Sequence, residues 1–167
     1  MYDLTLLKKY NISLSWDEIY AGIAYDILTI NSVSEFALDL AKKELLPNEL
    51  NELLWELNNK EETLKLLKKL LNPKDIKINM LSIKKKLRYT ILRELKDKES
   101  ELSKDDILSQ IALIYENFDY PSDMENFINY LPPKGNYNPN LHTLDENQTH
   151  LINEFHNFLI NEEKDMI

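Results

Sequence analysis

The sequence predicts an all-α protein, and two observations carry this expectation. Only two glycines, Gly22 and Gly135, occur in 167 residues, whereas sheets joined by tight hairpins need more residues that can adopt positive φ. Helix-start signals followed by apolar residues three or four positions apart recur along the whole chain. We expect about eight helices in a compact multi-helix bundle or a short stack of helical hairpins. A true solenoid is the lesser alternative, because no period of roughly 34–47 residues is present.

The first two helices are predicted over residues 16–29 and 33–45. Each opens with a capping box, formed by Ser15 with Glu18 and by Ser32 with Glu35. Trp16, and Trp55 further along, are expected to anchor the core.

Three further helices are predicted in the middle of the chain. Pro47 suits the first turn of a helix over residues 47–58, and Asn59 can cap another helix that Pro73 ends. The longest apolar stripe then predicts a helix over residues 79–98. That stripe consists of Met80, Ile83, Leu87, Ile91 and Leu95.

Three start signals mark the helices of the last third. These are Ser103, Ser122 with Glu125, and Thr143 with Glu146. Pro132 and Pro133 end the second of these helices, and residues 133–142 have the composition of an irregular surface loop.

Composition favours one soluble domain over residues 1–167. The chain is 43% hydrophobic, has no long Pro/Gly/Ser linker and contains no cysteine, which excludes disulfides and thiolate metal sites. It has no secretory cleavage signal and no apolar segment near the roughly 20 residues that a membrane span needs. We therefore expect an unexported protein of the cytoplasm with no membrane partner.

Charge is distributed unevenly. Residues 51–100 carry 13 basic and 8 acidic side chains, whereas residues 101–167 carry 3 basic and 13 acidic ones. One explanation is simple solvation of helix faces. The other is an acidic surface that attracts a basic partner.

The residues give little sign of catalysis or of nucleic-acid binding. His150 and His156 are six positions apart and point to different helix faces, so they do not suggest a metal pair. The lysine-rich helix over 79–98 is interrupted by acids and has few arginines, which argues against nucleic acid. We expect no catalytic residues, metal or cofactor, and no enzyme.

The segment ENFDYPSDMENFINYLPP is the most distinctive part of the chain. It packs aromatic and acidic residues around Pro121, which should break the chain between two helices, with Phe118 packed inward. The residues predicted to bind a partner here are Asp119, Tyr120, Asp123, Glu125 and Tyr130.

The longer segment IYENFDYPSDMENFINYLPP resembles the hallmark of a family of uncharacterised bacterial helical proteins, catalogued as a domain of unknown function. The resemblance covers most of the chain. Trp16, Gly22, Phe36 and Ala37 are similar in placement, and Asn117 departs from the acidic residue expected there. The resemblance implies an association with polymorphic toxin and contact-dependent inhibition loci, where such proteins act as immunity proteins. It brings no catalytic residues.

We therefore expect an immunity protein that binds a basic cognate toxin domain and neutralises it; the oligomeric state is left open. A helical adaptor that binds a peptide or protein is the alternative, and an enzyme of unrecognised type is the third. A flat acidic face rimmed by tyrosine favours the first, a concave groove lined by leucine and aromatics favours the second, and a deep pocket of perturbed carboxylates favours the third.

Overall fold

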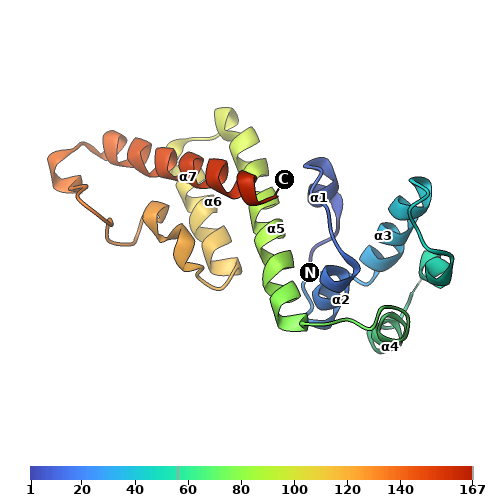
Figure 1. The fold of residues 1–167 in the computed structure, drawn as a ribbon. Helices are drawn as coiled ribbons and strands as arrows, with labels where there is room; N and C mark the ends of the chain where they lie inside the picture. Colours follow the sequence, from blue (N-terminus) through green and yellow to red (C-terminus); the bar gives the residue numbers. More distant parts are fainter. Residues whose placement is uncertain (56, 167) are drawn as a thin grey trace. The chain divides into compact units, whose positions relative to one another are not determined.

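The computed structural model describes residues 1–55 and 57–166, and over these residues the protein is all-α, as predicted (Figure 1). The described part has no β-strand and a single isolated bridge, between Tyr2 and Leu28. The α-helices are α1 (Thr5–Lys9), α2 (Trp16–Ala24), α3 (Asn31–Lys42), α4 (Lys60–Leu71), α5 (Ile76–Asp97), α6 (Lys104–Asn117) and α7 (Leu144–Met166). Short 3-10 helices are η1 (Asn48–Leu54), η2 (Glu99–Glu101), η3 (Ser122–Phe127) and η4 (Pro139–Leu141).

The helices form two compact units, Met1–Leu87 and Arg88–Ile167. Helix α5 supplies residues to both units. The expectation of a single domain over the whole chain stays a prediction. No helix in the described part is both long enough and apolar enough to cross a membrane.

In the first unit, the predicted capping box opens α2. The Ser15 hydroxyl accepts a hydrogen bond from the Glu18 amide (3.2 Å), and the Glu18 carboxylate accepts one from the Ser15 amide (2.8 Å). The helix ends at Ala24 rather than near residue 29, because the amides of Ile27 and Leu28 both donate to the Gly22 carbonyl. A side chain at Gly22 would lie 2.5 Å from Leu28 Cδ1, so this close turn requires glycine.

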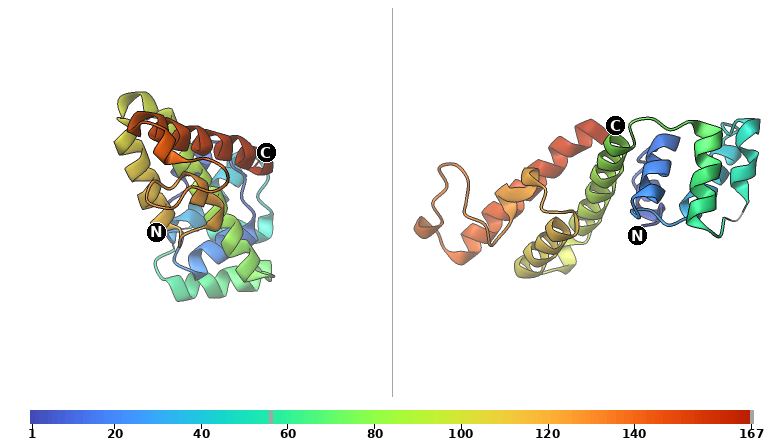
Figure 2. Two further views of the ribbon diagram at one scale, coloured as in Figure 1. Left: turned by 90° about the vertical axis from the view of Figure 1, so that its left-hand side faces the viewer. Right: turned by 90° about the horizontal axis from the view of Figure 1, so that it is seen from below.

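The other elements of the first unit differ more from the sequence expectation. Helix α4 packs beside α2 and has the predicted Asn59 cap, and η1 packs beside α3 (Figure 2). A short 3-10 helix replaces the α-helix predicted over residues 47–58. Trp55 is 75% exposed, so its predicted core role is wrong, whereas Trp16 packs edge-on against Phe36 with ring centroids 4.7 Å apart.

The capping box predicted at Ser32 and Glu35 is also wrong. Helix α3 already begins at Asn31, and its cap residue Ile30 makes no side-chain hydrogen bond. Ser32 instead lies inside the first turn, with its hydroxyl 3.2 Å from that of Thr29. The Glu35 carboxylate pairs with Lys8.

A buried carboxylate ties α2 to α5 within the first unit. Glu18 accepts hydrogen bonds from Lys86 Nζ (2.6 Å) and Ser82 Oγ (2.6 Å), and only 4% of it is exposed. Burial acts to raise the pKa of Glu18. The hydrogen bonds from Lys86, Ser82 and the Ser15 amide outweigh burial, so that the pKa lies below its usual value of 4.5.

This lowered pKa predicts acid sensitivity of the first unit. The unfolded state binds the proton more readily than the folded state. The charged Glu18 side chain therefore stabilises the folded protein at pH values above its ordinary pKa, and this stabilisation is lost as the pH falls through the lower pKa of the folded state. Glu18→Gln should cost about 1.5–3 kcal/mol at neutral pH, the value typical of hydrogen bonds to a charged group. Urea unfolding at a series of pH values from about 7 to about 3 measures this effect. The difference in free energy of unfolding between Glu18→Gln and wild type should become smaller as the pH falls. The exposed Glu61→Gln serves as the control, and a difference independent of pH would contradict the assignment.

In the second unit, α7 packs against α6 and η3 around an aromatic core. Phe127 and Phe155 are 1% and 0% exposed, and their ring centroids lie 5.9 Å apart. The predicted break before Pro121 is confirmed, because α6 ends at Asn117 and η3 starts at Ser122. The chain after η3 extends outward and then turns back into α7 (Figure 2).

Candidate functional site

The net charge of the protein resides in the second unit. Residues 88–167 contain 7 Lys and Arg against 16 Asp and Glu, whereas residues 1–87 contain 13 of each class. The formal charge of −9 therefore belongs to residues 88–167. A basic partner would be attracted to this unit rather than to the first.

The corner that follows α6 is a Schellman motif. The Tyr120 amide donates to the Tyr115 carbonyl (3.0 Å) and the Asp119 amide to the Glu116 carbonyl (3.1 Å). Asp119 is left-handed (φ 62°) at the position where glycine is usual, and aspartate is one of the few other residues that tolerate this conformation. Asp119 of the FDYP sequence therefore has a structural role, because it can adopt the conformation that this corner requires. Its carboxylate is also exposed.

Tyr120 is held outward by this corner. It too is left-handed (φ 56°), which is uncommon for an aromatic residue, and it is 57% exposed, whereas Phe118 is 8% exposed. The prediction that Phe118 packs inward is confirmed, and both Asp119 and Tyr120 beside it are accessible.

Three tyrosines form a cluster, defined here as Tyr115, Tyr120 and Tyr130. The buried Tyr115 ring lies 5.3 Å from the Tyr120 ring and 6.5 Å from the Tyr130 ring. Tyr130 is 59% exposed, so two aromatic faces are presented to solvent. Such faces accept the cationic side chains of a partner.

The surroundings of the tyrosine cluster are negative. The Glu116 carboxylate, which lies 3.5 Å from the Tyr120 hydroxyl, raises the pKa of Tyr120. Burial raises the pKa of Tyr115, and the nearby Glu125 carboxylate adds to this effect. The contributions of the Glu116 and Glu125 carboxylates indicate a local potential that disfavours a further negative charge and favours a cation.

Two of the predicted partner-binding residues have internal ion pairs. Both carboxylate oxygens of Asp123 accept hydrogen bonds from Arg88, each 2.7 Å long. Glu125 pairs with Lys134. Asp119, Tyr120 and Tyr130 are the other three predicted residues, and each of them is exposed.

Arg88 lies at the centre of a buried ion group. It is 5% exposed, its Nη2 is 3.3 Å from Glu162 Oε2, and its guanidinium lies 5.3 Å from the centre of the Phe158 ring. In the sequence it stands among the lysines of the helix predicted over residues 79–98, where charged side chains usually form a solvated face. Its burial means that this arginine is not available to a phosphate or a base.

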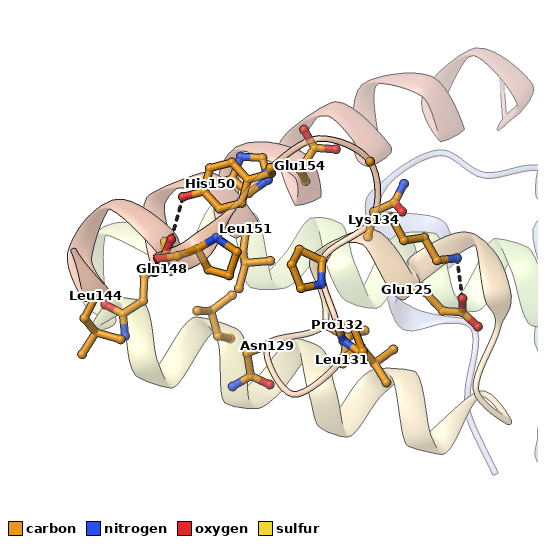
Figure 3. A pocket seen from close by; sticks show the side chains of 18 of the residues that line it. Glu125, Asn129, Leu131, Pro132, Lys134, Leu144, Gln148, His150, Leu151 and Glu154 are labelled. Carbon is orange, nitrogen blue, oxygen red and sulfur yellow. Dashed lines mark hydrogen bonds and ion pairs between the residues drawn. The ribbon is translucent and has the colours of Figure 1, made fainter. Parts of the chain in front are cut away.

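A cavity of about 720 Å³ lies between the chain after η3 and α7 (Figure 3). Its apolar wall consists of Leu108, Ile128, Leu131, Leu144, Leu151 and three prolines, Pro132, Pro133 and Pro139. The rings of Tyr137 and His150, several amide side chains and the charged groups Asp105, Glu125, Lys134 and Glu154 also line it. Figure 3 shows the Glu125–Lys134 pair on one side and His150, Leu151 and Glu154 along α7.

Aromatic stacking fixes the loop that borders this cavity. The Tyr137 ring is nearly parallel to the rings of His150 (centroids 3.7 Å apart) and His142 (4.9 Å). The Tyr137 hydroxyl donates to Asn147 Oδ1 (2.7 Å), and Asn147 Nδ2 donates to the Pro139 carbonyl (3.0 Å). Two of the three histidines therefore pack against a tyrosine. Within residues 1–55 and 57–166, no three His, Asp or Glu side chains are grouped as metal ligands.

Comparison with known proteins gives one match. The chain matches, over residues 4–164, the model of a family described as an uncharacterized protein conserved in bacteria (DUF2247). No curated protein and no solved structure matches it. Because this match spans nearly the whole sequence, the chain belongs to the DUF2247 family of bacterial proteins.

Proposed function

We propose that this protein is an immunity protein that captures a basic cognate toxin domain and covers its active surface. The observation that supports the proposal is the location of the whole net charge of −9 on residues 88–167, the unit that also carries the exposed tyrosines. The protein acts by binding rather than by catalysis and needs no cofactor. Its site of action is the cytoplasm, since a chain without cysteine suits a reducing compartment.

The binding surface has two physical functions. The negative field of the second unit accelerates encounter with a basic partner, because steering acts before contact. The exposed rings of Tyr120 and Tyr130 then offer large, rigid contact area next to the Glu116 carboxylate. A lysine or arginine of the partner can thus meet an aromatic face and a carboxylate together.

Association kinetics with the protein encoded by the adjacent gene test this surface. The double variant Glu116→Gln with Asp119→Asn keeps the shape of the corner, since asparagine also tolerates positive φ. We expect its association rate to fall about 3- to 10-fold at about 0.02 M salt and to approach that of wild type at about 0.5 M salt, where exposed charges are screened.

Glu49→Gln with Glu52→Gln is the matched control, because it removes two exposed carboxylates from the first unit. Tyr120→Ala should instead increase the dissociation rate, as expected for loss of a contact residue. Equal association rates for the two double variants would move the interface away from the tyrosine cluster.

A helical adaptor that binds a peptide is the second candidate. The observation that favours it is the cavity beside α7, whose wall of leucines, prolines and Tyr137 has the character of a peptide-binding pocket. An adaptor would retain binding to a partner peptide and give no protection against a toxin.

A further inference from the structure

We infer that the cavity beside α7 binds an extended segment of a protein partner and receives a lysine or arginine side chain from it. The first argument is size. At about 720 Å³ the cavity falls within the range of about 300–1,000 Å³ found for specific ligand pockets, and it can hold several side chains.

The second argument concerns the polar groups of the lining. Asn126, Asn129 and Asn136 border the cavity alongside its apolar wall. A side-chain amide carries both a donor and an acceptor, as does a peptide group, so it can pair with an extended backbone in either direction. All three asparagines are exposed, so their amides are accessible to such a segment.

The third argument is charge. Lys134 is already neutralised by Glu125, and Asp105 accepts a hydrogen bond from Gln148. Glu154 is half-buried on α7, and it forms no ion pair with any residue in the described part of the chain. With Asp105 still charged, the carboxylates of Glu154 and Asp105 leave the lining negative, and the ligand that complements it is a cation.

The position of Glu154 selects a long cationic side chain. It lies on the same helix as His150 and Leu151, so a ligand that pairs with it also contacts the apolar wall at Leu151 and the stacked rings at His150. Lysine and arginine bury their aliphatic stems and carry the charge at the tip. The stem can therefore pack on the apolar wall while the tip pairs with the Glu154 carboxylate. Phosphate groups and acidic peptides are disfavoured by the same carboxylate.

The inference rests on the proposed function only in taking the ligand to be a protein segment. Its test uses synthetic probes and does not require the toxin. The ¹⁵N-labelled full chain is titrated with two capped tripeptides, acetyl-Leu-Lys-Leu-amide and acetyl-Leu-Glu-Leu-amide, and backbone amide shifts are followed. The lysine peptide should shift the amides around Leu151 and Tyr137 and bind at least about 10-fold more tightly than the glutamate peptide.

Glu154→Gln should weaken binding of the lysine peptide about 3- to 10-fold. Glu101→Gln is the control, because it removes an exposed carboxylate of the same unit that does not line the cavity. Equal affinity for the two peptides, shifts elsewhere on the protein, or equal effects of the two variants would overturn the inference. Binding of n-butylamine as tight as that of the lysine peptide would also overturn it, since the ligand would then be a small amine.

The two proposals fail separately. Peptide binding in the cavity together with failure to capture the adjacent gene product would remove the immunity proposal and leave this inference intact. Capture of that product with no peptide binding in the cavity would overturn this inference and leave the immunity proposal intact.

Discussion

Replacing Arg88 with alanine is expected to lower the free energy of unfolding by about 3–5 kcal/mol, the range for removal of one partner from a buried ion group. The guanidinium holds both carboxylate oxygens of Asp123 and lies 3.3 Å from Glu162, which is itself 8% exposed. Without it, the buried Glu162 carboxylate loses its contact with the guanidinium, and the two hydrogen bonds that join Asp123 of η3 to α5 are lost. Urea unfolding followed by helical circular dichroism measures the loss, because both tryptophans lie in the first unit and do not report on this site.

Two arginine variants make the result specific. Arg88→Lys retains the charge but cannot form two parallel hydrogen bonds to Asp123, so it should recover only part of the loss. Arg93→Ala is the matched control on the same helix, where the ion pairs to Asp97 and Glu163 are each 3.7 Å long and partly exposed. Its cost should stay below about 1 kcal/mol. Similar losses for Arg88→Ala and Arg93→Ala would show that the buried ion group is not a centre of stability.

Phe155→Ala is expected to have an effect of similar size, about 3–5 kcal/mol. The ring is 0% exposed and packs against Phe127, so its removal forfeits burial and leaves a void in the middle of the second unit.

The control for Phe155 is Ile160→Ala on the same helix, since Ile160 is 51% exposed and has less contact area to lose. Its cost should be within about 1 kcal/mol. Thermal or urea unfolding of the two variants decides the point, and a small loss for Phe155→Ala would mean that the aromatic core contributes little to the stability of α7.

Long helices were predictable because their chemistry is local and periodic. The stripe from Met80 to Leu95 located most of α5, and side-chain caps at Asn59 and Ser103 fixed the starts of α4 and α6. The same reasoning missed α1, which has only five residues and no side-chain cap hydrogen bond. It also extended α2 too far, because the end of that helix depends on Gly22 accepting two amides from the turn that follows.

Cap signals were less dependable where another partner competes. Ser122 and Glu125 have the spacing of a capping box, yet η3 shows no side-chain cap and the Glu125 carboxylate binds Lys134 instead. Ser32 and Glu35 fail in the same way, since Lys8 takes the carboxylate. Tertiary ion pairs decided both cases, and residues 9 to 27 positions away along the chain cannot be identified from a local pattern.

The candidate site was predictable in part. Aromatic and acidic residues around Pro121 correctly marked a shaped corner with Tyr120 exposed. The buried partnership of Arg88 with Asp123 was not visible, because an arginine beside lysines on a helix has the pattern of a solvated face. The cavity was missed for a related reason. It is enclosed by an irregular loop whose position depends on the stacking of Tyr137 on His150, for which the sequence has no periodic signal.

Growth of bacteria that express the adjacent gene product tests the central claim most directly. The account predicts that the product inhibits growth when expressed alone, and that co-expression of this protein restores growth and yields a complex of the two proteins on purification. Glu116→Gln with Asp119→Asn should protect less well than Glu49→Gln with Glu52→Gln at equal expression. Inhibited growth that the wild-type protein does not relieve, with no complex recovered, would contradict the immunity function.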